Sequence, residues 1–289
     1  MNIGFIPVGA ELPIVHKKTL FEQIIALVSG TMTEPELYGW FHVFCLIVVG
    51  ILCALVVANR HKVTEKSMRL TVGLTGATLL AFEIYKQLVF SYTPDTDTWE
   101  YQWYAFPFQF CSTPMYVMTL AALVKKGNFR DCLLAFLATY SLVAGGAVML
   151  YPATVFVETI GINIQTMVHH GSMVVIAIYL LSSGLIKFDL RTILTKALPV
   201  FGALVGVALI LNLLFMQFGD DSTFNMFFLA PGQGYLLPFL EAIFDGLPYP
   251  VYLFSYIFFF SIAAYLVILS ARGIVRLHQT VKEKSVSQR

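Results

Sequence analysis

The chain has 289 residues, of which 58% are hydrophobic and 12% are charged, and its mean hydropathy is +0.77. Soluble domains carry about 25% charged residues, so this composition excludes a soluble globular enzyme and a disordered chain. The net charge of +1 provides no basic surface for phosphates, so we expect no nucleic-acid partner and take the bilayer as the solvent of this chain.

Residues 1–36 are expected to form an extracellular N-terminal segment. Within it, Thr19–Gly30 is apolar with a helical period, but its length of about 12 residues is too short to cross a bilayer. An interfacial or re-entrant helix fits this stretch better.

Residues 37–271 are expected to form the membrane domain, because seven segments reach the length of about 20 mainly apolar residues that a span requires. The expected fold class is therefore all-α, a polytopic bundle of seven transmembrane helices. The expected spans are Tyr38–Ala58, Met68–Phe90, Ala105–Val124, Asp131–Tyr151, Ile162–Leu185, Ala197–Phe218 and Pro250–Ala271.

Nearly all of the 18 Lys and Arg residues fall in one alternate set of connections or in residues 272–289. The exceptions are Lys17, Lys18 and Lys86. Because cytoplasmic segments are rich in Lys and Arg, the N-terminus is expected outside and residues 272–289 as a cytoplasmic tail. We expect a multi-pass protein of the cell membrane with membrane lipids as partners. The sequence identifies no protein partner.

Residues 219–250 are expected to fold back over the outer face as a lid. The stretch Phe224–Pro250 is rich in Phe, Leu, Gly and Pro, and a loop this apolar should not be surrounded by water. Small residues, such as the pair Gly202 and Gly206 and the pair Gly145 and Gly146, are expected at helix contacts.

Polar side chains inside the expected spans gather in the outer halves of four helices and in the following loop. Ionisable and polar groups are costly in a bilayer and indicate function by default. Because such groups must satisfy one another away from water, we expect a buried polar pocket that opens outward. The residues expected to bind the substrate there are Glu83, Lys86, Gln109, Gln165, Asn212 and Asn225.

Cys111 lies between Pro107 and Pro114, so the helix around it is expected to be kinked or broken. A thiolate activated by a nearby imidazole attacks acyl carbonyls, which makes Cys111 a candidate nucleophile with a histidine of the fifth span as general base. In this interpretation Glu83 orients the imidazole, and Gln109 or a freed amide holds the oxyanion.

Simpler interpretations of the same residues stay open. Glu83 and Lys86 are three residues apart and can form a structural ion pair. His169 and His170 are adjacent, about 100° apart on a helix, so one is expected to face the pocket and the other to pack elsewhere. A zinc site made from Cys111, Glu83 and these histidines is weaker, because ligand pairs on one helix face are four residues apart. We expect no metal and no cofactor.

Three segments, in order, resemble the YwaF/TMEM164 family of integral membrane proteins. They are FPFQFCSTPMY (Phe106–Tyr116), QTMVHHGSMVV (Gln165–Val175) and FNMFFLAPG (Phe224–Gly232). The resemblance implies a membrane acyltransferase that acts on lysophospholipids with a catalytic Cys and His. By position these are Cys111 and either His169 or His170, with His170 preferred. Gln109 stands where the family often has histidine.

Three functions therefore compete at this point. The first is Cys–His acyl transfer or hydrolysis on a phospholipid or lysophospholipid at the outer leaflet. The second is a non-catalytic binder, transporter or sensor of a small polar solute or lipid headgroup. The third is a structural subunit whose buried polar groups hold helices in register.

Overall fold

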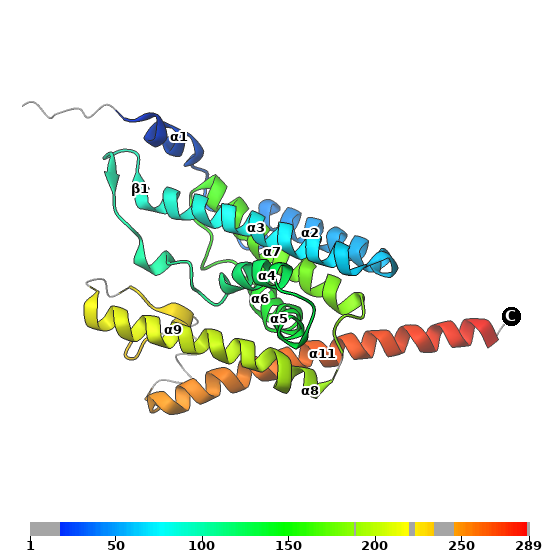
Figure 1. The fold of residues 1–289 in the computed structure, drawn as a ribbon. Coiled ribbons are helices and arrows are strands. Elements are labelled where there is room, and N and C mark those ends of the chain that lie inside the picture. The colour runs from blue at the N-terminus through cyan, green and yellow to red at the C-terminus, as the bar shows by residue number, and fades with distance from the viewer. Residues whose placement is uncertain (1–17, 188, 220–222, 234–245, 288–289) are drawn as a thin grey trace, which may run out of the picture.

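The computed structural model describes residues 18–187, 189–219, 223–233 and 246–287, and within these it is all-helical apart from one short hairpin (Figure 1). The predictions for residues 1–17, for 220–222 and 234–245 of the expected lid, and for the last two residues of the tail lie outside the described residues. The helices are α1 (Leu20–Val28), α2 (Trp40–Ala58), α3 (Glu65–Ser91), α4 (Thr113–Leu123), α5 (Asn128–Ala138), α6 (Tyr140–Leu150), α7 (Ile160–Ser182), α8 (Leu190–Thr192), α9 (Leu198–Phe218) and α11 (Tyr249–Ser287).

Short elements join these helices. Strands β1 (Tyr92–Thr93) and β2 (Thr98–Trp99) pair antiparallel after α3. The remaining short helical turns are η1 (Arg60–Lys62), η2 (Trp103–Ala105), η3 (Ile193–Ala197) and η4 (Met226–Phe228).

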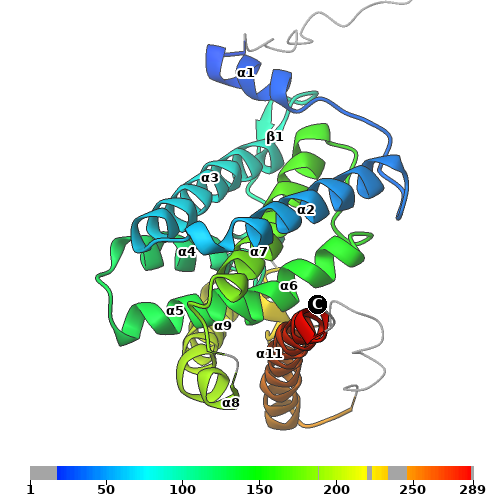
Figure 2. The ribbon, with the colours of Figure 1, turned by 90° about the vertical axis from the view of Figure 1, so that its right-hand side faces the viewer.

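The helices form three layers in both views. Helices α2, α3 and α7 lie on one side, α9 and α11 on the opposite side, and α4, α5 and α6 between them (Figures 1 and 2). The aromatic rings of Tyr140 and Phe201 stack at 4.4 Å where the middle layer meets α9. The Tyr140 hydroxyl is 2.7 Å from the Ser261 hydroxyl, which ties α6 to α11.

Five helical segments in the described residues are long and apolar enough to cross a membrane. The chain is therefore a helical, multi-pass membrane protein. The two other expected spans are not among these five segments, for separate reasons. Helix α3 has 27 residues but carries five charged side chains, and α4 has only 11 residues. The count of seven spans and the orientation of the termini stay predictions. The five segments are Trp40–Ala58, Asn128–Leu150, Ile160–Ser182, Leu190–Phe218 and Tyr249–Ile274.

Several expected boundaries were wrong. The expected span Ala105–Val124 is helical only over α4, and the expected span Asp131–Tyr151 is broken at Thr139. Thr139 leaves helical geometry (φ −126°, ψ −78°) while its hydroxyl donates to the Ala135 carbonyl. The last expected span, Pro250–Ala271, agrees with the apolar segment Tyr249–Ile274, and its helix continues to Ser287, so most of the expected tail is helical.

Of the glycines expected at helix contacts, Gly145 makes a close contact, whereas Gly146, Gly202 and Gly206 do not among the described residues. A Cβ added at Gly202 or Gly206 would meet no atom within 4 Å, so this pair makes no close contact among the described residues. A Cβ at Gly76 would lie 2.7 Å from the Thr119 hydroxyl on α4, and one at Gly145 would lie 2.7 Å from Met173 on α7. Small residues therefore let α3 approach α4 and α6 approach α7.

Gly161, in the first turn of α7, gives a test of this packing. A Cβ there would overlap Tyr85, whose hydroxyl donates to the Val28 carbonyl (2.9 Å). Gly161→Ala is expected to lower the free energy of unfolding by about 1–3 kcal/mol, because overpacking must displace the ring. Thermal unfolding in detergent measures this. Tyr85→Ala in the same chain should recover most of the loss, and Gly146→Ala, into open space, is the control. Equal melting of G161A and G146A would contradict the packing.

An ion pair between a buried guanidinium and a partly exposed carboxylate joins the start of α3 to α5. The Arg130 guanidinium, 2% exposed, donates two hydrogen bonds to the Glu65 carboxylate, one of them 2.9 Å long. The Arg130 hydrogen bond holds the pKa of Glu65 below its ordinary value. The stabilisation is therefore present above the unfolded pKa and is lost as the pH falls through the lowered folded pKa.

Removing the Glu65 charge leaves the buried Arg130 guanidinium without a counter-ion, which should destabilise the fold. Glu65→Gln is expected to lower the free energy of unfolding at pH 7 by about 1–2 kcal/mol, less than for a fully buried pair because Glu65 is 43% exposed. The difference from wild type should shrink as the pH falls below the ordinary pKa of a glutamate, and disappear once the pH passes the lowered pKa of Glu65 in the folded protein. Asp131→Asn, which breaks the more exposed Lys196 pair, should cost less. A pH-independent effect of E65Q would contradict the charge argument.

Candidate functional site

Cys111 lies in an irregular segment, residues 106–112, that leads into α4. Because Pro114 has no N–H to donate to the Phe110 carbonyl, this carbonyl accepts a hydrogen bond from the Thr113 hydroxyl (3.0 Å). The break expected around Cys111 is therefore confirmed, and it leaves main-chain groups outside the helical hydrogen-bond pattern.

An imidazole of α7 binds the Cys111 carbonyl. The Met115 N–H donates to the Ser112 carbonyl (3.3 Å), so the Cys111 oxygen is left to His169 Nε2, which lies 2.9 Å away. A carbonyl oxygen only accepts, so Nε2 carries the hydrogen of the neutral ring. The opposite nitrogen, His169 Nδ1, then has a free lone pair. The contact holds the His169 ring against the main chain of Cys111.

His170, preferred from the sequence, is bonded within its own helix. Its Nδ1 lies 2.8 Å from the Thr166 carbonyl one turn earlier, so its Nε2 has the free lone pair. The two imidazole centroids are 5.4 Å apart, and both side chains are buried. Of the two, only His169 is hydrogen-bonded to Cys111 among the described residues, so His169 is the better placed base.

Helix α3 adds a buried ion pair. Lys86 Nζ lies 2.8 Å from Glu83 Oε1, which confirms the expected pairing. Gln87, which the sequence analysis missed although it lies one turn beyond Glu83, donates to the same oxygen and to the Ala105 carbonyl, both at 2.7 Å. The Gln87 bond to the Ala105 carbonyl joins α3 to the residues just before the Cys111 segment, so the pair belongs to the same region.

Three buried atoms of this region have no hydrogen-bond partner among the described residues. They are Glu83 Oε2, His169 Nδ1 and His170 Nε2. With the tautomers above, all three are acceptors, and buried acceptors are normally satisfied. The region therefore favours a ligand or substrate group that carries O–H or N–H donors.

Two expected arrangements are not seen in the described part of the chain. No hydrogen bond joins the Cys111 thiol to either imidazole, and Glu83 binds neither ring. The prediction that Glu83 orients the imidazole is therefore wrong, because main-chain carbonyls do so. No three His, Cys, Asp or Glu side chains there are placed to hold a metal ion, which leaves the zinc alternative without a ligand set.

Gln109 and Asn212, two of the expected substrate contacts, bind the main chain of the loop that holds η4. Asn212 donates to the Met226 carbonyl (2.9 Å) and accepts the Met226 N–H (2.7 Å). Gln109 donates to the Asn225 carbonyl (2.9 Å) and accepts the Phe227 N–H (3.0 Å). Both amides thus secure the loop rather than hold an oxyanion, and a contact of either with a substrate stays a prediction.

The same loop carries backbone strain. Phe227 and Phe228 have φ of 58° and 57°, a region that residues with a Cβ rarely adopt. The Asn225 side chain accepts the Ala230 N–H (2.8 Å), and the Tyr252 hydroxyl donates to the Phe228 carbonyl (2.8 Å). The described part of the expected lid is therefore folded into the bundle and held by side-chain amides and hydroxyls.

Gln165 is buried one turn before His169 and makes no side-chain hydrogen bond to the described residues. Residues four apart share a helix face, so its amide lies on the His169 side of α7. Its role as a substrate contact stays a prediction.

The model of the TMEM164 family matches residues 37–268, most of the chain and all of the site residues described above. The chain belongs to the TMEM164 family. The resemblance in the three short segments is thereby confirmed. No curated protein and no solved structure matches the chain at significant similarity.

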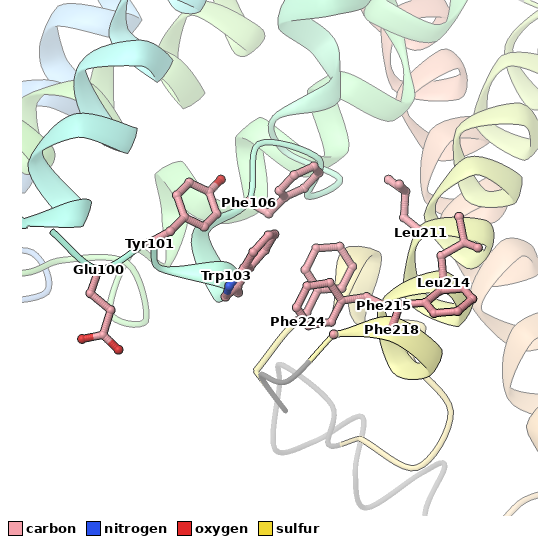
Figure 3. Close-up of a pocket in the computed structure, with 10 residues that line it drawn as sticks. Glu100, Tyr101, Trp103, Phe106, Leu211, Leu214, Phe215, Phe218 and Phe224 are labelled. Carbon is pink, nitrogen blue, oxygen red and sulfur yellow. The ribbon is translucent and has the colours of Figure 1, made fainter.

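A cleft of about 930 Å³ lies beside the polar region of this TMEM164-family protein, between the α3–α4 connection and α9 (Figure 3). The sequence analysis missed it, because its two walls are more than 100 positions apart in the chain. Trp103 and Phe106 form one wall, and Leu214 and Phe215 belong to the other. Burial and, second, the Glu83 carboxylate raise the pKa of Tyr101, which also lines the cleft.

Proposed function

We propose that this TMEM164-family membrane protein transfers acyl chains between lipids through a thioester on Cys111, with His169 as general base. The observation that carries the proposal is the hydrogen bond between the His169 ring and the Cys111 carbonyl. This bond holds the His169 ring against the segment that carries Cys111, and a thiol with an imidazole is the pairing that nucleophilic acyl chemistry requires. Thiol–imidazole contacts are often long before substrate binds, so the absent thiol hydrogen bond is compatible with this role.

The proposed reaction has two balanced halves. First, His169 Nδ1 takes the thiol proton, the Cys111 sulfur attacks the ester carbonyl of a donor phospholipid, and the lysophospholipid leaves with that proton. Second, the hydroxyl of an acceptor lysophospholipid gives its proton to His169 and attacks the thioester, and the thiol is restored. Water in place of the acceptor gives hydrolysis.

Lys86 supports both halves by its charge. Each half passes through a tetrahedral intermediate with a negative oxygen, and a cation in a site of low polarity stabilises such an oxygen strongly. The Glu83 partner keeps the buried ammonium from being an isolated charge. Gln109, Asn212 and Asn225 act in this proposal as positioning residues of the surrounding wall.

The charge distribution predicts that this site faces the outer leaflet of the cell membrane. The experiment that tests the function uses purified protein in vesicles that contain a phospholipid with a labelled acyl chain and an unlabelled lysophospholipid. The expected result is labelled product from the acceptor, at a rate above protein-free vesicles. No transfer and no hydrolysis by folded protein, across several headgroups and chain lengths, would contradict the proposal.

A second function, non-catalytic recognition of a polar solute or lipid headgroup, is favoured by the three unpaired acceptors Glu83 Oε2, His169 Nδ1 and His170 Nε2. A donor-rich ligand would satisfy all three without any reaction at Cys111. Saturable binding of a lysophospholipid, unchanged in Cys111→Ser and without turnover in wild type, would favour this function over acyl transfer.

A further inference from the structure

The cleft between the α3–α4 connection and α9 has chemically different ends. Its walls are aromatic and aliphatic: Trp103 and Phe106 on one side, Leu211, Leu214 and Phe215 on the other (Figure 3). The Tyr101 hydroxyl points toward the bundle, whereas Glu100 points away from it (Figure 3). An apolar channel with a polar end suits an amphipathic molecule rather than a polar solute.

The segments that line the cleft also carry residues of the candidate site. The wall residue Phe106 lies in the segment that carries Gln109 and Cys111, and Phe224 precedes Asn225 in the clamped loop. Rings of the two walls touch, with the Trp103 and Phe215 centroids 4.8 Å apart and those of Phe215 and Phe224 at 4.2 Å. A molecule in the cleft therefore contacts the same segments that position Cys111.

The surroundings of the cleft identify its occupant. The rim of the cleft includes the exposed rings of Tyr101 and Trp103, and such rings favour the headgroup level of a membrane. Exposed apolar side chains of α9, such as Leu213 and Phe218, continue from this rim along a helix apolar enough to span a bilayer. The molecules available at that boundary are membrane lipids, and a volume of about 930 Å³ is in the range of sites for small organic ligands.

We infer that this cleft holds one hydrocarbon chain of a membrane lipid, with the lipid's polar group at Tyr101 and directed toward the Lys86–Glu83 pair. The inference rests on the proposed function, for which it names the entry route and the class of substrate, a phospholipid or lysophospholipid. In this arrangement the chain lies against Phe106, Leu211 and Leu214, beside the contact between the Trp103 and Phe215 rings, while the ester end approaches Cys111.

Photolabelling tests the cleft without relying on turnover. The probe is a lysophosphatidylcholine with a diazirine in its acyl chain, added at low mole fraction to vesicles that contain the whole protein. Labelled peptides are identified by mass spectrometry. Leu214→Trp and, separately, Leu211→Trp fill the cleft, while Leu213→Trp is the matched control, because Leu213 lies on the same helix and is 56% exposed but does not line the cleft.

Label is expected on residues 101–106 and 211–218, saturable by unlabelled lipid. Filling the cleft should lower this labelling about tenfold, because an added ring costs the chain its space. L213W should be labelled like wild type. Cys111→Ser should also be labelled, so the cleft can be tested even if the protein does not transfer acyl chains. Equal labelling in all tryptophan variants would overturn the inference. So would label concentrated instead on the apolar groove between α2 and α7, around Val48, Val49 and Val168.

Discussion

Cys111→Ser is expected to lower acyl transfer at least about a thousandfold, because a serine hydroxyl is a far weaker nucleophile with no mechanism here for its full activation. The measurement is labelled-chain transfer between lipids in vesicles, with folding checked by thermal unfolding. Cys53→Ser is the matched control, since Cys53 is a half-buried thiol of α2. Its activity should equal that of wild type.

Substitutions of His169 and His170 test which histidine is the general base. His169→Gln should lower the rate roughly 100- to 10,000-fold, because it removes the base while its side-chain amide can still donate to the Cys111 carbonyl. His170→Gln should cost less, since the ring is bonded to Thr166 and not to Cys111. A larger loss in H170Q would reassign the base, and full activity in both C111S and H169Q would eliminate this mechanism.

Asn212→Ala is expected to lower the free energy of unfolding by about 1–3 kcal/mol, because it leaves the Met226 N–H unpaired inside the protein and removes one of the two hydrogen bonds to the Met226 carbonyl, which keeps the Leu229 N–H. Thermal unfolding in detergent measures this loss, and amide hydrogen exchange should rise at Met226 and Phe227. The strain at Phe227 and Phe228 makes this loop the first place to loosen.

A control on the same helix separates this effect from general damage to α9. Gln217 is exposed near the end of α9, so Gln217→Ala should leave both stability and exchange unchanged. If N212A and Q217A behave alike, the amide does not secure the loop, and Asn212 returns to being a candidate substrate contact.

Composition and proline chemistry predicted much of this fold. The long apolar segments and the break at Cys111 follow from local sequence, since chain length and a missing N–H act without distant partners. The break at Thr139 was missed, because the strongly apolar segment around it gives no local signal of an interruption. The charged residues of α3 lower its mean hydropathy below that of a typical span, although Glu83 and Lys86 neutralise each other as an ion pair.

Sequence patterns indicated which residues belong to the candidate site but not which contacts each of them makes. Which histidine meets Cys111 depends on the rotation of α7 and on a carbonyl released 58 positions away. The pairing of Gln109 and Asn212 with loop main chain likewise joins distant segments, which no spacing rule reveals. The cleft depends on side chains from two such segments and has no signature in either one.

The most direct measurement of the central claim is the mass of the protein during turnover. Vesicles with donor phospholipid but no acceptor should yield protein heavier by one acyl chain, attached to Cys111 and released by neutral hydroxylamine, and the adduct should disappear when lysophospholipid is added. Product formation without any adduct on Cys111, or with the chain on another residue, would contradict the account.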